Sequence, residues 1–282
     1  MVAAKEIPPT AIVRQEDTSP RIEKSAADNQ TPWQFFAPRD IGKLNGVTER
    51  DWTGELERWL DEKFAEACEA TGQRRPLSGL RINPPLGGDE AKYFLLGLEE
   101  GLFLPDAAGY LQSELFPSAT EEDPKPKIGQ IFRHDCSPPR LAREVVCQLA
   151  TASLLILKRG WLKSHVALEA GSEEHRAAAF GLDLLVKSPA GNILVWVEVR
   201  RSLVELEKLI VDLRACSRRG PHGRQDCGFP QNHPRYEFAL CHKPEYLWAV
   251  APDGETCFRL GYANGSMELE EIPSLPPRSL IE

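Results

Sequence analysis

Two acidic residues stand in apolar, β-rich runs of the sequence. Asp183 is the second residue of the run LDLLV, and Glu198 lies 15 positions later, near the end of the run ILVWVEV. Carboxylates in apolar strands are seldom buried without a partner. If the two strands pair, both carboxylates lie at one edge of the sheet, where they repel each other unless a hard cation such as Mg²⁺ or Mn²⁺ binds between them. The pattern therefore indicates a candidate metal site.

The segments around these residues predict the elements that position them. Residues 188–192 (SPAGN) predict a turn between two antiparallel strands. Apolar residues at helical spacing predict one helix between Pro139 and Gly160 and another over residues 203–216. Further strands are expected at VALE (166–169), YEFALC (236–241), EYLWAVA (245–251), TCFRLGY (256–262) and MELEEI (267–272). This order of elements predicts an α/β or α+β fold, in which helices flank a mixed sheet.

The remaining segments predict the organisation of the chain. The N-terminus is rich in proline and charge, whereas two later stretches, 51–72 and 89–102, have the apolar stripe of amphipathic helices. An acidic, proline-containing stretch over 118–129 predicts a linker. We therefore expect a loose arm (1–30), a helical N-terminal region (31–130), a core (138–272) and a short tail (273–282).

An Asp opens one strand, a hairpin follows, and the next strand ends in Glu-Val-Arg before a helix. This order resembles the core of the restriction-endonuclease-like superfamily, the PD-(D/E)xK nucleases. The resemblance covers roughly residues 140–250. It implies that Asp183 and Glu198 are metal ligands, that the Val199 carbonyl assists them, and that Arg200 occupies the position of the lysine. It also implies a further acid from the preceding helix or strand, for which the candidates are Glu144, Glu169, Glu173 and Glu174, and of these Glu169 is assigned the catalytic role.

The arginine at position 200 separates two functional interpretations. With a pKa above about 12 it cannot act as a general base at neutral pH, but it can stabilise charge on a phosphate. The resemblance therefore implies an endonuclease that depends on Mg²⁺ or Mn²⁺, cleaves DNA, and acts in restriction, phage defence or mobile-element processing. The alternative is a noncatalytic subunit of the same fold that binds nucleic acid or a protein within a complex. A purely structural interpretation has Asp183 capping a turn and Glu198 paired with Arg200 or Arg201 on a solvated strand edge.

The stretch from residue 200 to 224 is basic within an acidic chain. It contains seven Lys and Arg residues and three Asp and Glu residues, a local charge of +4. Such a cluster suits a phosphate backbone, although Glu205, Glu207 and Asp212 can instead pair with these bases along a helix. The candidate nucleic-acid contacts are Arg201, Lys208, Arg218, Arg219, His222 and Arg224.

Four potential zinc ligands fall within the same part of the chain. Cys216, His222, Cys227 and His233 offer the sulfur and nitrogen atoms of a tetrahedral Zn²⁺ site. Their spacing matches none of the short paired motifs of known zinc sites, so zinc is the less favoured interpretation. Alternatively the cysteines are buried or in a turn, and the histidines are exposed or contact phosphates.

Composition and charge exclude several classes of protein. The 282 residues carry a net charge of −8, which argues against a protein that coats nucleic acid through its overall field but leaves a local basic cleft open. The longest apolar stretch, residues 149–157, is too short to cross a membrane, and the N-terminus lacks the pattern of a secretory signal. Seven cysteines without regular spacing indicate reduced thiols. We therefore expect a cytoplasmic protein without a membrane partner; a protein partner or a second copy of the chain stays open.

Overall fold

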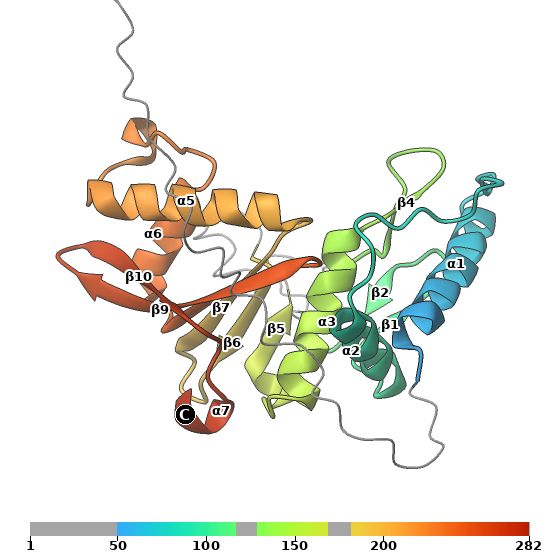
Figure 1. Ribbon diagram of the computed structural model, residues 1–282, viewed down its shortest axis with the longest axis horizontal. Helices are drawn as coiled ribbons and strands as arrows, with labels where there is room; N and C mark the ends of the chain where they lie inside the picture. The colour runs from blue at the N-terminus through green and yellow to red at the C-terminus, as the bar shows by residue number, and fades with distance from the viewer. Residues whose placement is uncertain (1–49, 117–128, 169–181, 282) are drawn as a thin grey trace, which may run out of the picture. The chain divides into compact units, whose positions relative to one another are not determined.

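A mixed six-stranded sheet forms the framework of the molecule (Figure 1). The computed structural model describes residues 50–116, 129–168 and 182–281. In spatial order the strands are β10 (Ser266–Ile272), β9 (Gly254–Ala263), β8 (Tyr246–Ala251), β7 (Ile193–Val199), β6 (Leu184–Lys187) and β5 (Val166–Leu168). Neighbouring strands are antiparallel except β7 and β8, which run parallel. The mixed sheet confirms the predicted α/β (α+β) class.

Helices cover both faces of the sheet, as predicted (Figure 1). They are α1 (Trp52–Ala70), α2 (Gly88–Glu99), α3 (Arg143–Leu157), α5 (Leu203–Arg219), α6 (His233–His242) and the short α7 (Arg278–Ile281). On one face α3 packs against the sheet, α2 packs against α3, and α1 packs against α2. On the other face α5 and α6 pack together and contact β10, and α5 also contacts β8. The predicted helices over 51–72, 89–102, 139–160 and 203–216 are therefore confirmed.

Strand β7 separates two hydrophobic cores. Val195, Val197 and Val199 belong to the core beneath α3, whereas Trp196 belongs to the core beneath α5 and α6. Successive side chains of a strand point to opposite faces, so a strand that is apolar throughout must be covered on both sides. All seven residues of β7 are buried accordingly, and Glu198 is buried among them.

Short elements connect the larger ones. They are the strand pairs β1 (Leu104–Pro105) with β2 (Leu111–Gln112) and β3 (Phe132–Arg133) with β4 (Arg140–Leu141), and the 3₁₀ turns η2 (Lys163–His165) and η3 (Arg224–Asp226). The first strand pair follows α2, within the region that the sequence predicts as helical.

The predicted hairpin is present in β6 and β7. Its turn is closed by the Ser188 N–H, which donates to the Asn192 carbonyl at 2.8 Å, and Gly191 adopts a positive φ of 85° that favours glycine. In the hairpin Leu184 pairs with Val197. Continuing this register by one step places residue 183 opposite residue 198. The two candidate carboxylates therefore lie at the same end of the hairpin.

The stretch YEFALC, predicted as a strand, lies in α6 instead, so this prediction is wrong. Its alternating apolar residues also have a helical interpretation, because Tyr236 and Ala239 are three apart and both are buried. Pro234 stands in the first turn of α6, a position that favours helix. The helical solution fits the topology, since parallel strands β7 and β8 need a long crossover, which α5, the loop after it and α6 provide.

Several sequence predictions fall on residues that the structure does not describe. These are the arm (1–30) and most of the linker (118–129). Among the described residues, no helix is both long enough and apolar enough to cross a bilayer. All seven cysteines lie in the described part, and each is a free thiol.

Candidate functional site

Three carboxylates and one carbonyl surround the guanidinium of Arg200. Nη1 of Arg200 lies 3.4 Å from Asp183 Oδ2 and 3.8 Å from Glu144 Oε1, and it donates to the Val199 carbonyl at 2.6 Å. Nη2 forms an ion pair with Glu198 Oε2. The predicted metal ligands and one of the candidate additional acids are thus brought together, and an arginine side chain lies where they meet.

Glu198 is fully buried, and several donors fix its side chain. Its Oε1 accepts a hydrogen bond from Trp196 Nε1 at 2.9 Å, and its Oε2 accepts from Arg235 Nε at 2.8 Å and from Arg200. Glu198 does pair with Arg200, as the structural interpretation has it, but the pair is buried and does not lie on a solvated strand edge. Sequence reasoning missed Arg235 because it precedes the stretch that was assigned to a strand. A helical assignment of that stretch would have directed attention to it.

Two hydrogen bonds hold Asp183, one to its side chain and one to its main chain. The Val199 N–H donates to its Oδ2 at 2.7 Å, and Gln148 of α3 donates from Nε2 to its main-chain carbonyl at 2.6 Å. Burial raises the pKa of Asp183 well above its ordinary value, and the neighbouring Glu198 adds to the effect, although Arg200 opposes it. The site therefore holds this carboxyl group in place but disfavours its ionised form.

Solvent reaches the cluster at two of its acids. The side chain of Glu144 is 41% exposed and that of Asp183 is 19% exposed, whereas Glu198 is inaccessible. Burial raises the pKa of Glu144, although the charges of Arg200 and Arg201 oppose this shift. For Arg200, burial lowers the pKa, but the carboxylates around it outweigh burial and raise it above the ordinary value.

The carboxylates outnumber the guanidinium groups that contact them. Among the described residues, Glu144, Asp183 and Glu198 form ion pairs with Arg200 and Arg235, so these five groups carry a charge of −1 when all are ionised. Glu169, the additional catalytic acid of the prediction, lies outside the described residues, as do its alternatives Glu173 and Glu174. Within the described part, Glu144 is the acid that completes the cluster.

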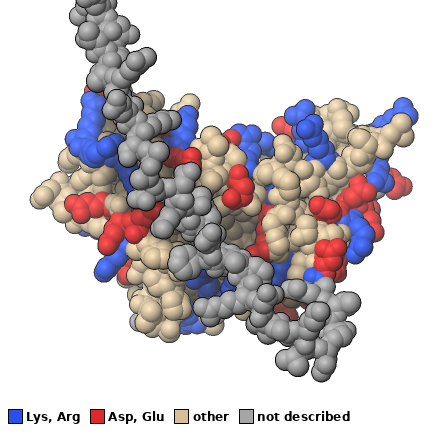
Figure 2. Space-filling model, viewed as in Figure 1, with Lys and Arg blue, Asp and Glu red and all other residues tan. Residues whose placement is uncertain are grey.

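The predicted nucleic-acid contacts do not form one patch around this cluster. Arg201 precedes the first turn of α5 and pairs with Glu205, whereas Arg218 and Arg219 lie in its last turn. At 1.5 Å per residue, the length of the helix separates them by about 25 Å. Figure 2 shows Lys and Arg side chains gathered over the C-terminal end of α5. Lys208 is exposed on α5, and Arg224 is exposed in η3, where its Nε donates to the Pro230 carbonyl.

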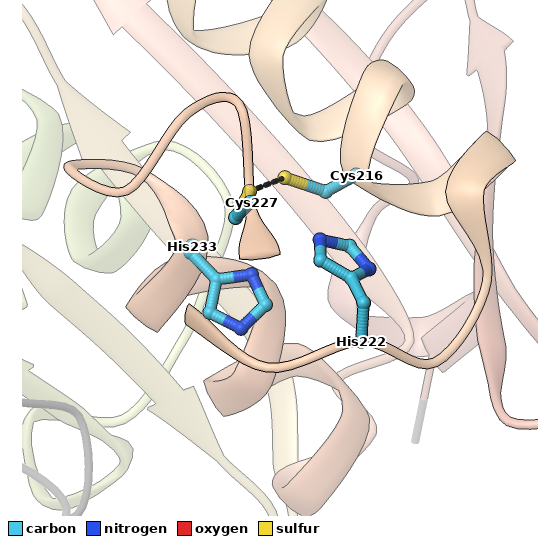
Figure 3. A group of neighbouring side chains, drawn as sticks. All are labelled: Cys216, His222, Cys227 and His233. Atoms are coloured by element: carbon cyan, nitrogen blue, oxygen red, sulfur yellow. Dashed lines mark hydrogen bonds between the residues drawn. The ribbon is translucent and has the colours of Figure 1, made fainter. Parts of the chain in front are cut away.

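The four predicted zinc ligands do come together (Figure 3). Cys216 lies in the last turns of α5, His222 and Cys227 in the loop that follows, and His233 at the start of α6. One ligand atom from each side chain lies within 4.8 Å of the others. The spacing in sequence gave little support to this site, because the loop between two packed helices, rather than a short paired motif, brings the side chains together. His222, also predicted as a nucleic-acid contact, belongs to this cluster.

Comparison with known protein families, with curated protein sequences and with solved structures gives no match for this chain.

Proposed function

We propose that this chain is a metal-dependent nuclease that hydrolyses phosphodiester bonds, with DNA as its favoured substrate. The observation that carries the proposal is the convergence of Glu144, Asp183 and Glu198 on one cationic group. The three acids come from a helix, from the start of β6 and from β7. A fold brings three carboxylates together at an energetic cost, which a cation between them offsets.

The oxygen donors have the chemistry of a magnesium or manganese site. Hard divalent cations prefer carboxylate and carbonyl ligands, and the guanidinium of Arg200 stands in for such a cation. Asp183 and Glu144 are accessible to solvent, so they are the carboxylates that would hold an ion first. The Val199 carbonyl becomes available when Arg200 turns away. Glu198, which is already hydrogen-bonded on both oxygens, would act mainly through its charge.

Arg200 has a second use once it leaves the carboxylates. Its planar fork of N–H donors matches the oxygens of a phosphate, where it would stabilise the charge that develops during cleavage. A divalent cation, when bound, neutralises phosphate charge and lowers the pKa of the attacking water. Asp183 and Glu144 must be ionised to bind it, so we expect the cleavage rate to rise with pH.

The order of the elements supports a relationship to the restriction-endonuclease-like superfamily. From α3 to β8 the chain forms one helix, three antiparallel strands, a helical crossover and then a parallel strand. Asp183 and Glu198 lie at adjacent strand ends within this order, as the resemblance implies. Roles in restriction, phage defence or mobile-element processing belong to the same proposal.

One observation favours a second candidate, a noncatalytic subunit that binds nucleic acid or a protein partner. Arg200 already bonds to Glu198, to Asp183 and to the Val199 carbonyl, so a guanidinium group occupies these acceptors in the folded chain without a metal ion. If Arg200 cannot leave this position, the cluster only stabilises the fold.

Cleavage of supercoiled plasmid and of single-stranded DNA with Mg²⁺ or Mn²⁺ separates the two candidates. The nuclease proposal predicts metal-dependent cutting that Asp183→Asn and Glu144→Gln each reduce by at least about a hundredfold, the scale on which loss of one electrostatic group slows other enzymes. Glu207→Gln, an exposed acid on α5 purified in the same way, is the matched control and should cut like the native chain.

Two outcomes contradict the nuclease proposal. One is cutting that survives in both variants, which would assign the activity to a contaminant. The other is a native chain that is folded but cuts neither the plasmid nor the single-stranded DNA, with Mg²⁺ or with Mn²⁺. The second outcome favours the noncatalytic subunit, whose partner would then be sought by binding measurements with nucleic acid.

A further inference from the structure

The Cys/His cluster, formed by Cys216, His222, Cys227 and His233, contains polar atoms that are buried without a hydrogen bond. Both ring nitrogens of His233 and Nε2 of His222 are buried and make no hydrogen bond to any described residue. The His233 side chain is itself fully inaccessible. Leaving such groups without hydrogen bonds destabilises a fold. A ligand that accepts their lone pairs would remove this penalty.

Each histidine is oriented so that one nitrogen faces away from the cluster toward an oxygen. Nδ1 of His222 lies 2.6 Å from the Gly220 carbonyl, which leaves Nε2 for a ligand. Nε2 of His233 lies 3.3 Å from Glu237 Oε1, at ion-pair distance, which leaves Nδ1. Metal-binding histidines commonly direct their second nitrogen to a carbonyl or carboxylate in this way. Figure 3 shows the two rings below the two sulfur atoms.

The distances within the cluster suit a tetrahedral ion with two sulfur and two nitrogen ligands. From Zn–S and Zn–N lengths of about 2.3 and 2.1 Å, ligand atoms in a tetrahedral site are roughly 3.3–3.8 Å apart. Here the sulfur atoms of Cys216 and Cys227 are 3.3 Å apart, and no pair of ligand atoms exceeds 4.8 Å. Shifts of about 1 Å or less would complete the geometry. The thiolate and imidazole donors favour Zn²⁺ over the hard cations of the acid cluster.

The loop between α5 and α6 has little else to hold it. From Gly220 to Gln231, only Cys227 is buried, and most of the other side chains are exposed. A structural zinc site supplies the stability that such a segment cannot obtain from apolar burial.

We propose that Cys216, His222, Cys227 and His233 bind one Zn²⁺ ion, which closes the crossover between β7 and β8 and fixes the start of α6. The ion replaces the protons of the two thiols, which pass to the solvent. The site is independent of the proposed nuclease activity. It has one structural consequence for the acid cluster: Arg235, two residues after His233, is held where it reaches Glu198.

The test is metal analysis of the full chain, purified under reducing conditions without a chelator. We expect one zinc per chain, and, after exchange with Co²⁺, the visible absorption and thiolate charge-transfer bands of tetrahedral cobalt with sulfur ligands. Cys227→Ser should lose the zinc and these bands. Cys241→Ser, an exposed cysteine on α6, is the matched control and should keep both.

If Cys227→Ser fails to fold, the native chain provides the test. Removal of zinc by a chelator should lower the melting temperature, and added Zn²⁺ should restore it. A folded, reduced chain that contains no zinc and gives no cobalt bands would overturn the proposal. So would zinc that stays bound in a folded Cys227→Ser variant, or a mass that reveals a disulfide between Cys216 and Cys227 in the reduced preparation. Plasmid cleavage is scored separately, so loss of one proposal leaves the other standing.

Discussion

The acid cluster around Arg200 and the Cys/His cluster differ in what they still lack. In the acid cluster the chain supplies both the anions and a cation, since Arg200 contacts three carboxylates. In the Cys/His cluster the chain supplies only donors of lone pairs, and three of its ring nitrogens have no hydrogen-bond partner in the described structure.

This difference determines how each region should respond to a metal ion. A metal at the acid cluster must displace an arginine that is covalently part of the chain, so metal binding there competes with an intact ion-pair network. A metal at the Cys/His cluster displaces only thiol protons. Burial, with the neighbouring Cys227, raises the pKa of Cys216 to about 12, and zinc must overcome this shift to bind the thiolate. We therefore expect a resident ion at the Cys/His cluster and a conditional one at the acid cluster.

The largest expected effect comes from removing the central acid of the acid cluster. Glu198→Ala removes the carboxylate that the largely buried Arg200 and Arg235 share. We expect a loss of about 3–5 kcal/mol in the free energy of unfolding, because removing one partner leaves uncompensated buried charge. Urea unfolding of the native chain and the variant measures it, with the exposed Glu207→Ala on α5 as control. A loss below about 1 kcal/mol would mean that the arginines find other partners and that the network contributes little.

A smaller effect tests whether the two clusters are coupled through α6. His233→Ala should loosen the start of this helix, so that Arg235→Met destabilises the variant less than it destabilises the native chain. Contacting or coupled residues show interaction energies of about 0.5–3 kcal/mol in double-mutant cycles. The cycle is measured by unfolding of the native chain and the variants in the presence of Zn²⁺, with Cys241→Ala in place of His233→Ala as control. Additive losses for the His233 and Arg235 variants would show that zinc does not position Arg235.

The hairpin and the acid pair could be predicted from the sequence because their signals are local. Alternation of apolar residues gives β6 and β7, and a short turn fixes their register, so the carboxylates at residues 183 and 198 must share one end. The completing acid could only be narrowed to four candidates, since contact between α3 and the sheet depends on packing. The position of the Arg200 guanidinium among the three carboxylates depends on the rotamer of its side chain, which the sequence does not specify.

The Cys/His cluster and α6 were harder to predict because both depend on the crossover. The stretch YEFALC satisfies the period of a strand and that of a helix, and its place in the crossover, where it packs against α5 and β10, favours the helix. Once that stretch is helical, His233 and Arg235 lie on its first turn and reach different clusters. Ligands brought together by such a topology have no characteristic spacing, so the sequence pattern alone gave zinc little support.

The smallest expected effect is a change in how steeply the free energy of unfolding depends on pH, and it arises from Asp183 in the acid cluster. Burial raises the pKa of Asp183 above its unfolded value of about 3.9, so the folded chain keeps a proton there that the unfolded chain has lost. Stability contributed by this group therefore falls as pH rises above about 4, by at most about 1.4 kcal/mol per pH unit. Asp183→Asn removes this contribution while keeping an oxygen to accept from the Val199 N–H. The stability of the variant relative to the native chain should therefore increase as pH rises through this window.

The same pH titration shows whether the charge of Asp183 is destabilised by the fold or is fully compensated by Arg200. Asp135→Asn changes an exposed acid far from β7 in sequence and should leave the pH profile of unfolding parallel to that of the native chain. If Asp183→Asn is also parallel, Arg200 fully compensates Asp183, and a metal ion would gain little from binding beside it. If the relative stability of Asp183→Asn rises with pH, the acid cluster lacks positive charge in the folded chain. That unmet charge is the condition under which a divalent cation can compete with Arg200 for the carboxylates.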